Sequence, residues 1–136
     1  MHRDDCRLIG DNMIEPLSAN TLLGKLVLAL SVKSFQQDKV EVFNPDVYLR
    51  DGDTLDSYGV NASIIGLPGH TKGSIGIRFG NNDLFVGDAL MNIMYPAKSL
   101  LYGNRTDMIK SAEKISTYKG VTIHFGHGKS VSNKIW

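Results

Sequence analysis

The spacing of apolar residues is helical in the first part of the chain and strand-like in much of the second. Residues 22–35 carry leucine, valine and phenylalanine at roughly helical intervals, with Asn20 or Thr21 available as the N-cap. Gly24 lies inside this segment, where glycine costs up to about 1 kcal/mol relative to alanine. The pattern nevertheless predicts a helix over residues 22–35.

Short apolar runs bounded by turn residues predict strands in the second part of the chain. The runs are residues 47–49, 62–67, 74–79, 84–86 and 121–125. The sequence Gly80-Asn81-Asn82-Asp83 joins two of them and is typical of a hairpin connection. Asp51-Gly52-Asp53 indicates a turn after the first run.

A second amphipathic segment, residues 106–118, predicts a helix whose N-cap is Thr106 or Asp107. Its apolar face would consist of Met108, Ile109, Ala112 and Ile115. Helices and strands together predict a mixed α/β fold, with residues 1–136 forming one domain.

Composition narrows the classes of partner. The chain has 15 Lys and Arg against 14 Asp and Glu, a net charge of +1, which gives no electrostatic basis for binding nucleic acid or an anionic membrane. Residues 22–32 are too short an apolar stretch to span a bilayer, and Cys6, the single cysteine, cannot form an internal disulfide. We therefore expect a cytoplasmic protein with neither nucleic acid nor membrane as a partner.

Three polar residues, His70, Asp88 and His127, each follow a predicted strand and stand beside glycine. Strand ends at one sheet edge lie close in space, and flanking glycines leave room for a ligand. Two imidazoles and a carboxylate suit Zn²⁺, Fe²⁺ or Mn²⁺. The same residues also fit a loop histidine, a turn former and a strand-end surface residue, so the pattern alone leaves both interpretations open.

Neighbouring residues are expected to have structural roles. Thr71 and Ser74 should bond turn backbone, and His124 should be structural or exposed because alternation does not place it with His127. Lys72 and Lys129 are expected to be solvated charges, and Cys6 is expected to be a small buried residue. Residues 91–104 would carry substrate contacts in a complete enzyme, although we favour packing for their Met and Tyr side chains.

The motifs around these residues resemble the metallo-β-lactamase superfamily. They are Pro-Gly-His-Thr-x-Gly-Ser at residues 68–74, Phe-Val-Gly-Asp at 85–88 and Gly-His-Gly at 126–128. Residues 2–5 and 51–55 also resemble glyoxalase II-like hydrolases. The resemblance implies an αβ/βα sandwich with mixed sheets face to face and helices outside. It also implies that His70 completes a first metal site, Asp88 bridges two metals and His127 binds the second.

The superfamily motif His-x-His-x-Asp-His is absent from this sequence, whose histidines are His2, His70, His124 and His127. The chain therefore resembles the C-terminal portion of such an enzyme, with residues 1–44 as a remnant of the N-terminal half and residues 45–136 as the C-terminal half. Because half of the metal ligands are missing, we expect metal binding to be weak or absent in this chain.

The resemblance implies a metal-dependent hydrolase in which metal-bound hydroxide attacks a small-molecule thioester, lactone, ester or amide. The intact family would hold Zn²⁺ at two sites, with Fe or Mn as alternatives, and this chain would be an inactive portion. Two other functions stay open: a non-catalytic interaction or structural domain, and a di-iron redox relative of the hydrolases.

A missing half would leave one sheet face without its cover. Apolar residues in the strands that supply such faces are Ile64, Ile75, Ile77, Leu84 and Val86. We expect a homodimer to cover that face, because monomers rarely expose a large apolar patch. Folding of residues 22–35 onto the same face is the alternative.

Overall fold

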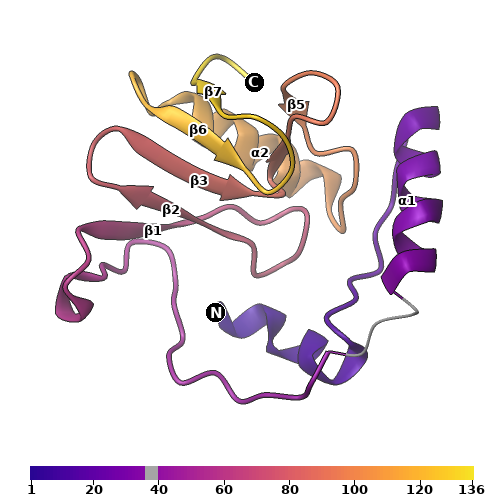
Figure 1. Ribbon diagram of the computed structural model, residues 1–136, viewed down its shortest axis with the longest axis horizontal. Coiled ribbons are helices and arrows are strands. Elements are labelled where there is room, and N and C mark those ends of the chain that lie inside the picture. Colours follow the sequence, from indigo (N-terminus) through magenta and orange to yellow (C-terminus); the bar gives the residue numbers. More distant parts are fainter. Residues whose placement is uncertain (36–39) are drawn as a thin grey trace.

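The computed structural model describes residues 1–35 and 40–136 (Figure 1). The predicted remnant, residues 1–44, includes residues 36–39, which lie outside this description. The helices are η1 (Arg3–Asp11), α1 (Leu22–Phe35), η2 (Asp56–Tyr58) and α2 (Arg105–Ser116). The strands are β1 (Ala62–Gly66), β2 (Ile75–Phe79), β3 (Asp83–Gly87), β4 (Leu90–Met91), β5 (Ala97–Lys98), β6 (Thr122–Phe125) and β7 (Val131–Ser132).

A mixed sheet with the strand order β1-β2-β3-β6-β7 forms the centre of the molecule. The β1–β2, β2–β3 and β6–β7 pairs are antiparallel, whereas β3 and β6 are parallel. The predicted mixed α/β fold class is confirmed, and four of the five predicted strands are present. The turn before β3 lies at Gly80, whose φ of 54° is readily adopted by glycine.

The prediction of a strand at residues 47–49 is wrong. The Leu49 N–H donates to the Met1 carbonyl at 2.9 Å, and the Met1 ammonium donates to the Val47 carbonyl at 3.0 Å. These hydrogen bonds tie the segment to the start of the chain and do not extend into a sheet ladder. Strands β4, β5 and β7 were not predicted, because two residues cannot display a period-2 pattern.

Helix α2 covers one face of the sheet (Figure 1). The core on this side contains Ile65, Leu67, Leu84, Val86, Ala89, Leu90, Ala112, Ile115, Val121 and Ile123. Asn104 caps the helix by accepting from the Asp107 N–H at 3.2 Å, so the predicted caps Thr106 and Asp107 are corrected. Asn104 can do this because its extended backbone aims the side chain at the free amides of the first turn.

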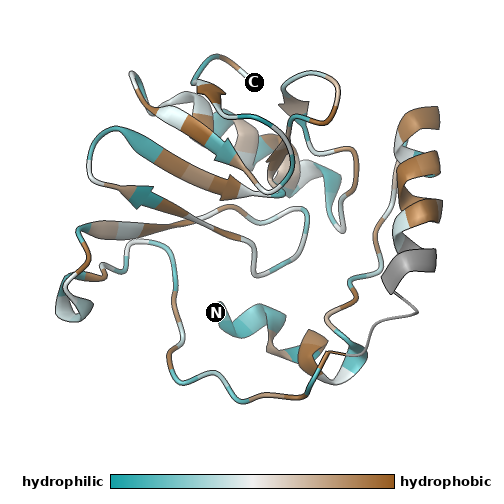
Figure 2. Cartoon of the chain, in the orientation of Figure 1, coloured by the Kyte–Doolittle hydropathy of each residue, from teal (hydrophilic) through white to brown (hydrophobic). Residues whose placement is uncertain are grey.

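Helix α1 stands beside the β4–β5 region and is apolar along most of its length (Figures 1 and 2). Thr21 is its cap, with the Gly24 N–H donating to Thr21 Oγ1 at 3.0 Å. A Cβ on Gly24 would lie 3.0 Å from the Leu100 carbonyl oxygen, so glycine allows the helix to approach this loop. Leu22, Leu26 and Leu30 remain exposed.

The sheet face opposite α2 carries Ile64, Ile77 and Phe85 in one cross-strand row. Leu84 and Val86 alternate with Phe85 and belong to the α2 side. Phe79 and Phe85 are 49% and 45% exposed, so α1 does not bury them. Coverage of these rings by a second copy stays a prediction.

Within the described parts of the chain, no helix combines the length and apolarity that a membrane crossing requires.

Candidate metal centre

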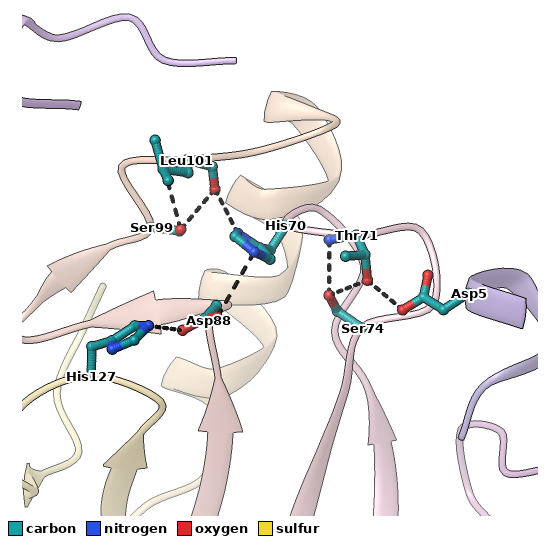
Figure 3. Close-up of polar contacts among 8 residues, drawn as sticks. All are labelled: Asp5, His70, Thr71, Ser74, Asp88, Ser99, Leu101 and His127. Carbon is teal, nitrogen blue, oxygen red and sulfur yellow. Dashed lines mark hydrogen bonds and ion pairs between the residues drawn. The ribbon is translucent and has the colours of Figure 1, made fainter. Parts of the chain in front are cut away.

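His70, Asp88 and His127 follow β1, β3 and β6, respectively. Since β1 and β3 are each antiparallel to β2, and β3 is parallel to β6, all three strands end at the same edge of the sheet. The three side chains gather at this edge, with Asp88 between the two imidazoles (Figure 3).

Each histidine faces a different oxygen of Asp88. The His70 Nε2 atom lies 3.8 Å from Asp88 Oδ2, and the His127 Nε2 atom lies 3.6 Å from Asp88 Oδ1. Both distances exceed those of a normal hydrogen bond. Among the described residues, no group of three or more His, Cys, Asp or Glu surrounds a single metal position. The arrangement is therefore two histidine–aspartate pairs, His70–Asp88 and His127–Asp88, which share the carboxylate of Asp88.

The main chain fixes the orientation of the His70 ring. Its Nδ1 atom lies 3.0 Å from the Leu101 carbonyl oxygen, which can only accept, so Nδ1 carries the proton. In the neutral ring this leaves the Nε2 lone pair directed at Asp88. Ser99 Oγ donates to the same carbonyl at 2.7 Å and helps to hold it in place.

Asp88 Oδ1 is a buried oxygen that has no hydrogen-bond partner among the described residues. The Asp88 side chain as a whole is 35% exposed, so the burial is confined to one side. A buried carboxylate oxygen without a partner, as Oδ1 is, is unfavourable unless a proton or a cation lies beside it, and so is a carboxylate oxygen that faces an imidazole lone pair, as Oδ2 faces that of His70. Zinc holds nitrogen and oxygen ligands at about 2.0–2.2 Å, which places two ligands of one ion about 3–4 Å apart. The donor set therefore fits a divalent cation.

Glycines shape the backbone around His127. A Cβ on Gly126 would lie 2.5 Å from Asp88 Oδ1, and a Cβ on Gly128 would lie 1.9 Å from the Asn92 carbonyl oxygen. The Asn92 N–H donates to the His127 carbonyl at 2.9 Å. The His127 backbone is thus fixed, while its side chain is 66% exposed and free to turn toward a ligand.

Asp5 supports the His70 loop from a distant part of the sequence. Its Oδ1 atom accepts from the Gly73 N–H at 2.7 Å, and its Oδ2 atom accepts from Thr71 Oγ1 at 2.6 Å (Figure 3). The expectation for Ser74 is confirmed, because its Oγ accepts from the Thr71 N–H at 2.9 Å. This role of Asp5 was not predicted, although residues 2–5 resemble a segment of the glyoxalase II-like hydrolases.

Other expectations near the site have mixed outcomes. Lys72 and Lys129 are exposed, and Cys6 is only half-buried. Met94 and Tyr95 are 73% and 63% exposed, so packing does not account for these two side chains. Both lie in the connection between β4 and β5, residues 92–96, whose first residue, Asn92, bonds to the His127 loop.

No family model matches the sequence. The uncharacterized protein Rv2581c of Mycobacterium tuberculosis is 31% identical over an alignment of 118 residues, and the match covers 81% of this chain and 51% of that protein. A hydroxyacylglutathione hydrolase of Photobacterium profundum is 30% identical over 86 residues, 62% of this chain and 33% of that enzyme. The chain thus spans about half the length of the mycobacterial protein and about a third of the length of the hydroxyacylglutathione hydrolase.

Solved structures define the fold. A metallo-β-lactamase family protein from Thermus thermophilus matches with a TM-score of 0.66 at 20% identity, over 98% of this chain and 47% of its own. The structure of TTHA1623 in a di-iron-bound form matches with a TM-score of 0.64 at 18% identity, over 97% of this chain and 58% of its own.

The chain has the fold of the metallo-β-lactamase superfamily, so the resemblance drawn from its motifs is confirmed at this level.

Proposed function

We propose that this chain carries part of the metal centre of a metal-dependent hydrolase, with His70, Asp88 and His127 as metal ligands. The observation that supports this most directly is the position of the Asp88 carboxylate between two imidazole groups, with its buried Oδ1 atom, on the His127 side, unpaired among the described residues. The similarity to a hydroxyacylglutathione hydrolase favours hydrolysis over other chemistry of this fold.

His70 and Asp88 would hold one metal ion, and Asp88 and His127 would hold a second. Zn²⁺ is our first choice for both positions, with Fe²⁺ and Mn²⁺ also suited to imidazole and carboxylate ligands. A divalent ion at this edge would polarise the carbonyl of a thioester, lactone, ester or amide and acidify a water molecule. The Leu101 carbonyl would keep the His70 ring in its ligating orientation.

The described residues supply two donor side chains to each proposed metal, whereas closed structural zinc sites have four ligands. We therefore propose that this chain alone binds metal weakly and does not turn over substrate at the metal centre. A non-catalytic role as a folded interaction domain remains the rival for the isolated chain. Failure to bind any metal would favour that rival.

A second candidate is redox chemistry at a di-iron centre. The structural match to TTHA1623, which was solved in a di-iron-bound form, favours including it. Preference of the chain for Fe²⁺ over Zn²⁺ in the titration described next would support this candidate over the hydrolase.

The proposal is tested by calorimetric titration of the chain with Zn²⁺, Fe²⁺ (under anaerobic conditions) and Mn²⁺. We expect His70→Ala and His127→Ala each to weaken binding at least about tenfold. His124→Gln is the matched control, since it removes a histidine outside the proposed centre. Equal affinity in all four proteins would contradict the proposed ligand set.

A further inference from the structure

Ser130, His124 and Asp83 form a chain of hydrogen bonds outside the proposed metal centre. His124 Nε2 lies 2.7 Å from Asp83 Oδ1, and Ser130 Oγ lies 2.8 Å from His124 Nδ1. Both distances are those of good hydrogen bonds. A hydroxyl, an imidazole and a carboxylate are thus connected in sequence, and none of the three belongs to the His70–Asp88–His127 set.

The sheet holds this array in place, because Asp83 lies in β3, His124 lies in β6 and Ser130 directly precedes β7. The parallel pairing of β3 with β6 places Phe85 opposite His124, and Asp83 lies two residues before Phe85 on the same face. The antiparallel pairing of β6 with β7 continues from Ile123 and Val131, which brings Ser130 next to His124. Because the backbone sets these positions, the array is part of the fold.

The proton positions follow from the partners. An ionised carboxylate only accepts, so His124 Nε2 donates to Asp83 and the Nδ1 lone pair accepts from the Ser130 hydroxyl. A serine whose proton is held by a base, with the base oriented by a carboxylate, is the arrangement of an activated serine nucleophile. We propose that Ser130 is a nucleophile that takes an acyl or phosphonyl group from esters, with His124 as its base and Asp83 as a positioning residue.

The surroundings indicate which esters would bind. Ser130 is exposed, and the Phe85 ring stacks on His124 with centroids 4.4 Å apart and planes 17° apart. Phe85 is 45% exposed, so an apolar acyl or aryl group can lie on it while the ester reaches Ser130. The substrate class is therefore an ester of an apolar acid or of a phenol.

Acyl transfer from the ester to Ser130 requires no metal. Ser130 Oγ forms a bond to the carbonyl carbon, its proton passes to His124 Nδ1, and the bond to the phenolic oxygen breaks. The phenolate leaves with its electron pair and takes the proton from His124. The products are an acyl-Ser130 ester and a phenol, and water then hydrolyses the ester to the acid.

The test is covalent modification of the purified, dilute chain by a fluorophosphonate, with the adduct located by peptide mass spectrometry. We expect the adduct on Ser130, none in Ser130→Ala, and normal labelling in Ser132→Ala, a matched exposed serine on β7. His124→Gln should slow labelling at least about tenfold, since a general base contributes about 10²–10⁴-fold. Asp83→Asn should also slow it, whereas Asp83→Glu should retain part of the rate because it keeps the carboxylate.

Two further measurements distinguish modification of Ser130 from any reaction at the metal centre. Labelling should be unchanged by a metal chelator and in His127→Ala. No adduct on Ser130, an equal rate in His124→Gln, or equal labelling of many serines would overturn the proposal. If His124→Gln loses the native circular dichroism spectrum, the Ser130→Ala and Ser132→Ala pair and the two Asp83 variants decide the question.

Discussion

The Nε2 atom of His70 faces Oδ2 of Asp88 at 3.8 Å, and both atoms are hydrogen-bond acceptors in the neutral form of the ring. Their approach is enforced from outside the pair, because the Leu101 carbonyl fixes the ring and the end of β3 fixes the carboxylate. Two acceptors held together in this way favour a cation between them. This relationship is the physical basis for placing a metal at the sheet edge.

Replacement of Gly69 should be among the most destabilising changes in the His70 loop. Gly69 has a φ of 140°, and a Cβ there would lie 2.4 Å from the backbone nitrogen of Met108 in α2. We expect Gly69→Ala to lower the free energy of unfolding by about 3–5 kcal/mol, measured by urea denaturation. Gly80→Ala is the control, since its Cβ would meet nothing within 4 Å, and it should cost about 1 kcal/mol. Equal costs would show that the contact with α2 is unimportant.

Much of the fold could be predicted from local patterns. The β2–β3 hairpin follows from apolar runs around Gly80, and the shared sheet edge follows from His70, Asp88 and His127 each standing after a strand. The rest depends on contacts between distant residues. Asp5 and Thr71 are 66 positions apart, and Phe85 meets His124 only through parallel pairing of β3 and β6. No local pattern encodes such contacts, so neither the Asp5 support nor the Ser130 array could be predicted.

The ion pair between Asp51 and Lys114 should make a pH-dependent contribution to stability. Lys114 Nζ donates to Asp51 Oδ1 at 2.9 Å, and this hydrogen bond, followed by that from the Gly66 N–H, lowers the pKa of Asp51 from 3.8. A carboxylate with a lowered folded-state pKa stabilises the fold above its unfolded pKa, and the gain is lost as pH falls through the folded value.

We therefore expect Asp51→Asn to cost about 0.5–1 kcal/mol at neutral pH, a modest value because the Asp51 side chain is largely exposed. The difference from wild type should shrink as the pH falls below about 4. Urea denaturation at several pH values measures it, and Asp56→Asn serves as the exposed control. A difference that stays constant with pH would contradict the ionic origin.

The exposed rings of Phe79 and Phe85 lead us to propose that two copies associate through this sheet face. We expect light scattering across a dilution series to show a dimer that dissociates at low concentration. Phe79→Ser should weaken the dimer, whereas Tyr58→Ser, at an exposed ring in η2, should not. A second copy on this face would also shield Ser130 from modification as the concentration rises. A clean monomer at all concentrations would refute the association.

Metal-dependent hydrolysis of thioester, lactone and β-lactam substrates by the isolated chain should be slight or absent, even after loading with Zn²⁺. The reason is the small number of donor side chains that the described residues offer to each proposed metal. Initial-rate assays with a buffer blank measure this. Robust metal-dependent turnover that is lost in both His70→Ala and His127→Ala would show that the centre is complete in this chain.

The most direct test of the central claim is the Zn²⁺ stoichiometry of Asp88 variants, measured by competition with a chromophoric chelator. If Asp88 is shared, wild type should bind up to two ions, His70→Ala and His127→Ala should each lose one, and Asp88→Asn should lose both. Asp56→Asn, a carboxylate in η2, should bind as wild type does. An Asp88→Asn protein that binds zinc like wild type, or that loses no more than a single-histidine variant, would contradict a shared carboxylate at this site.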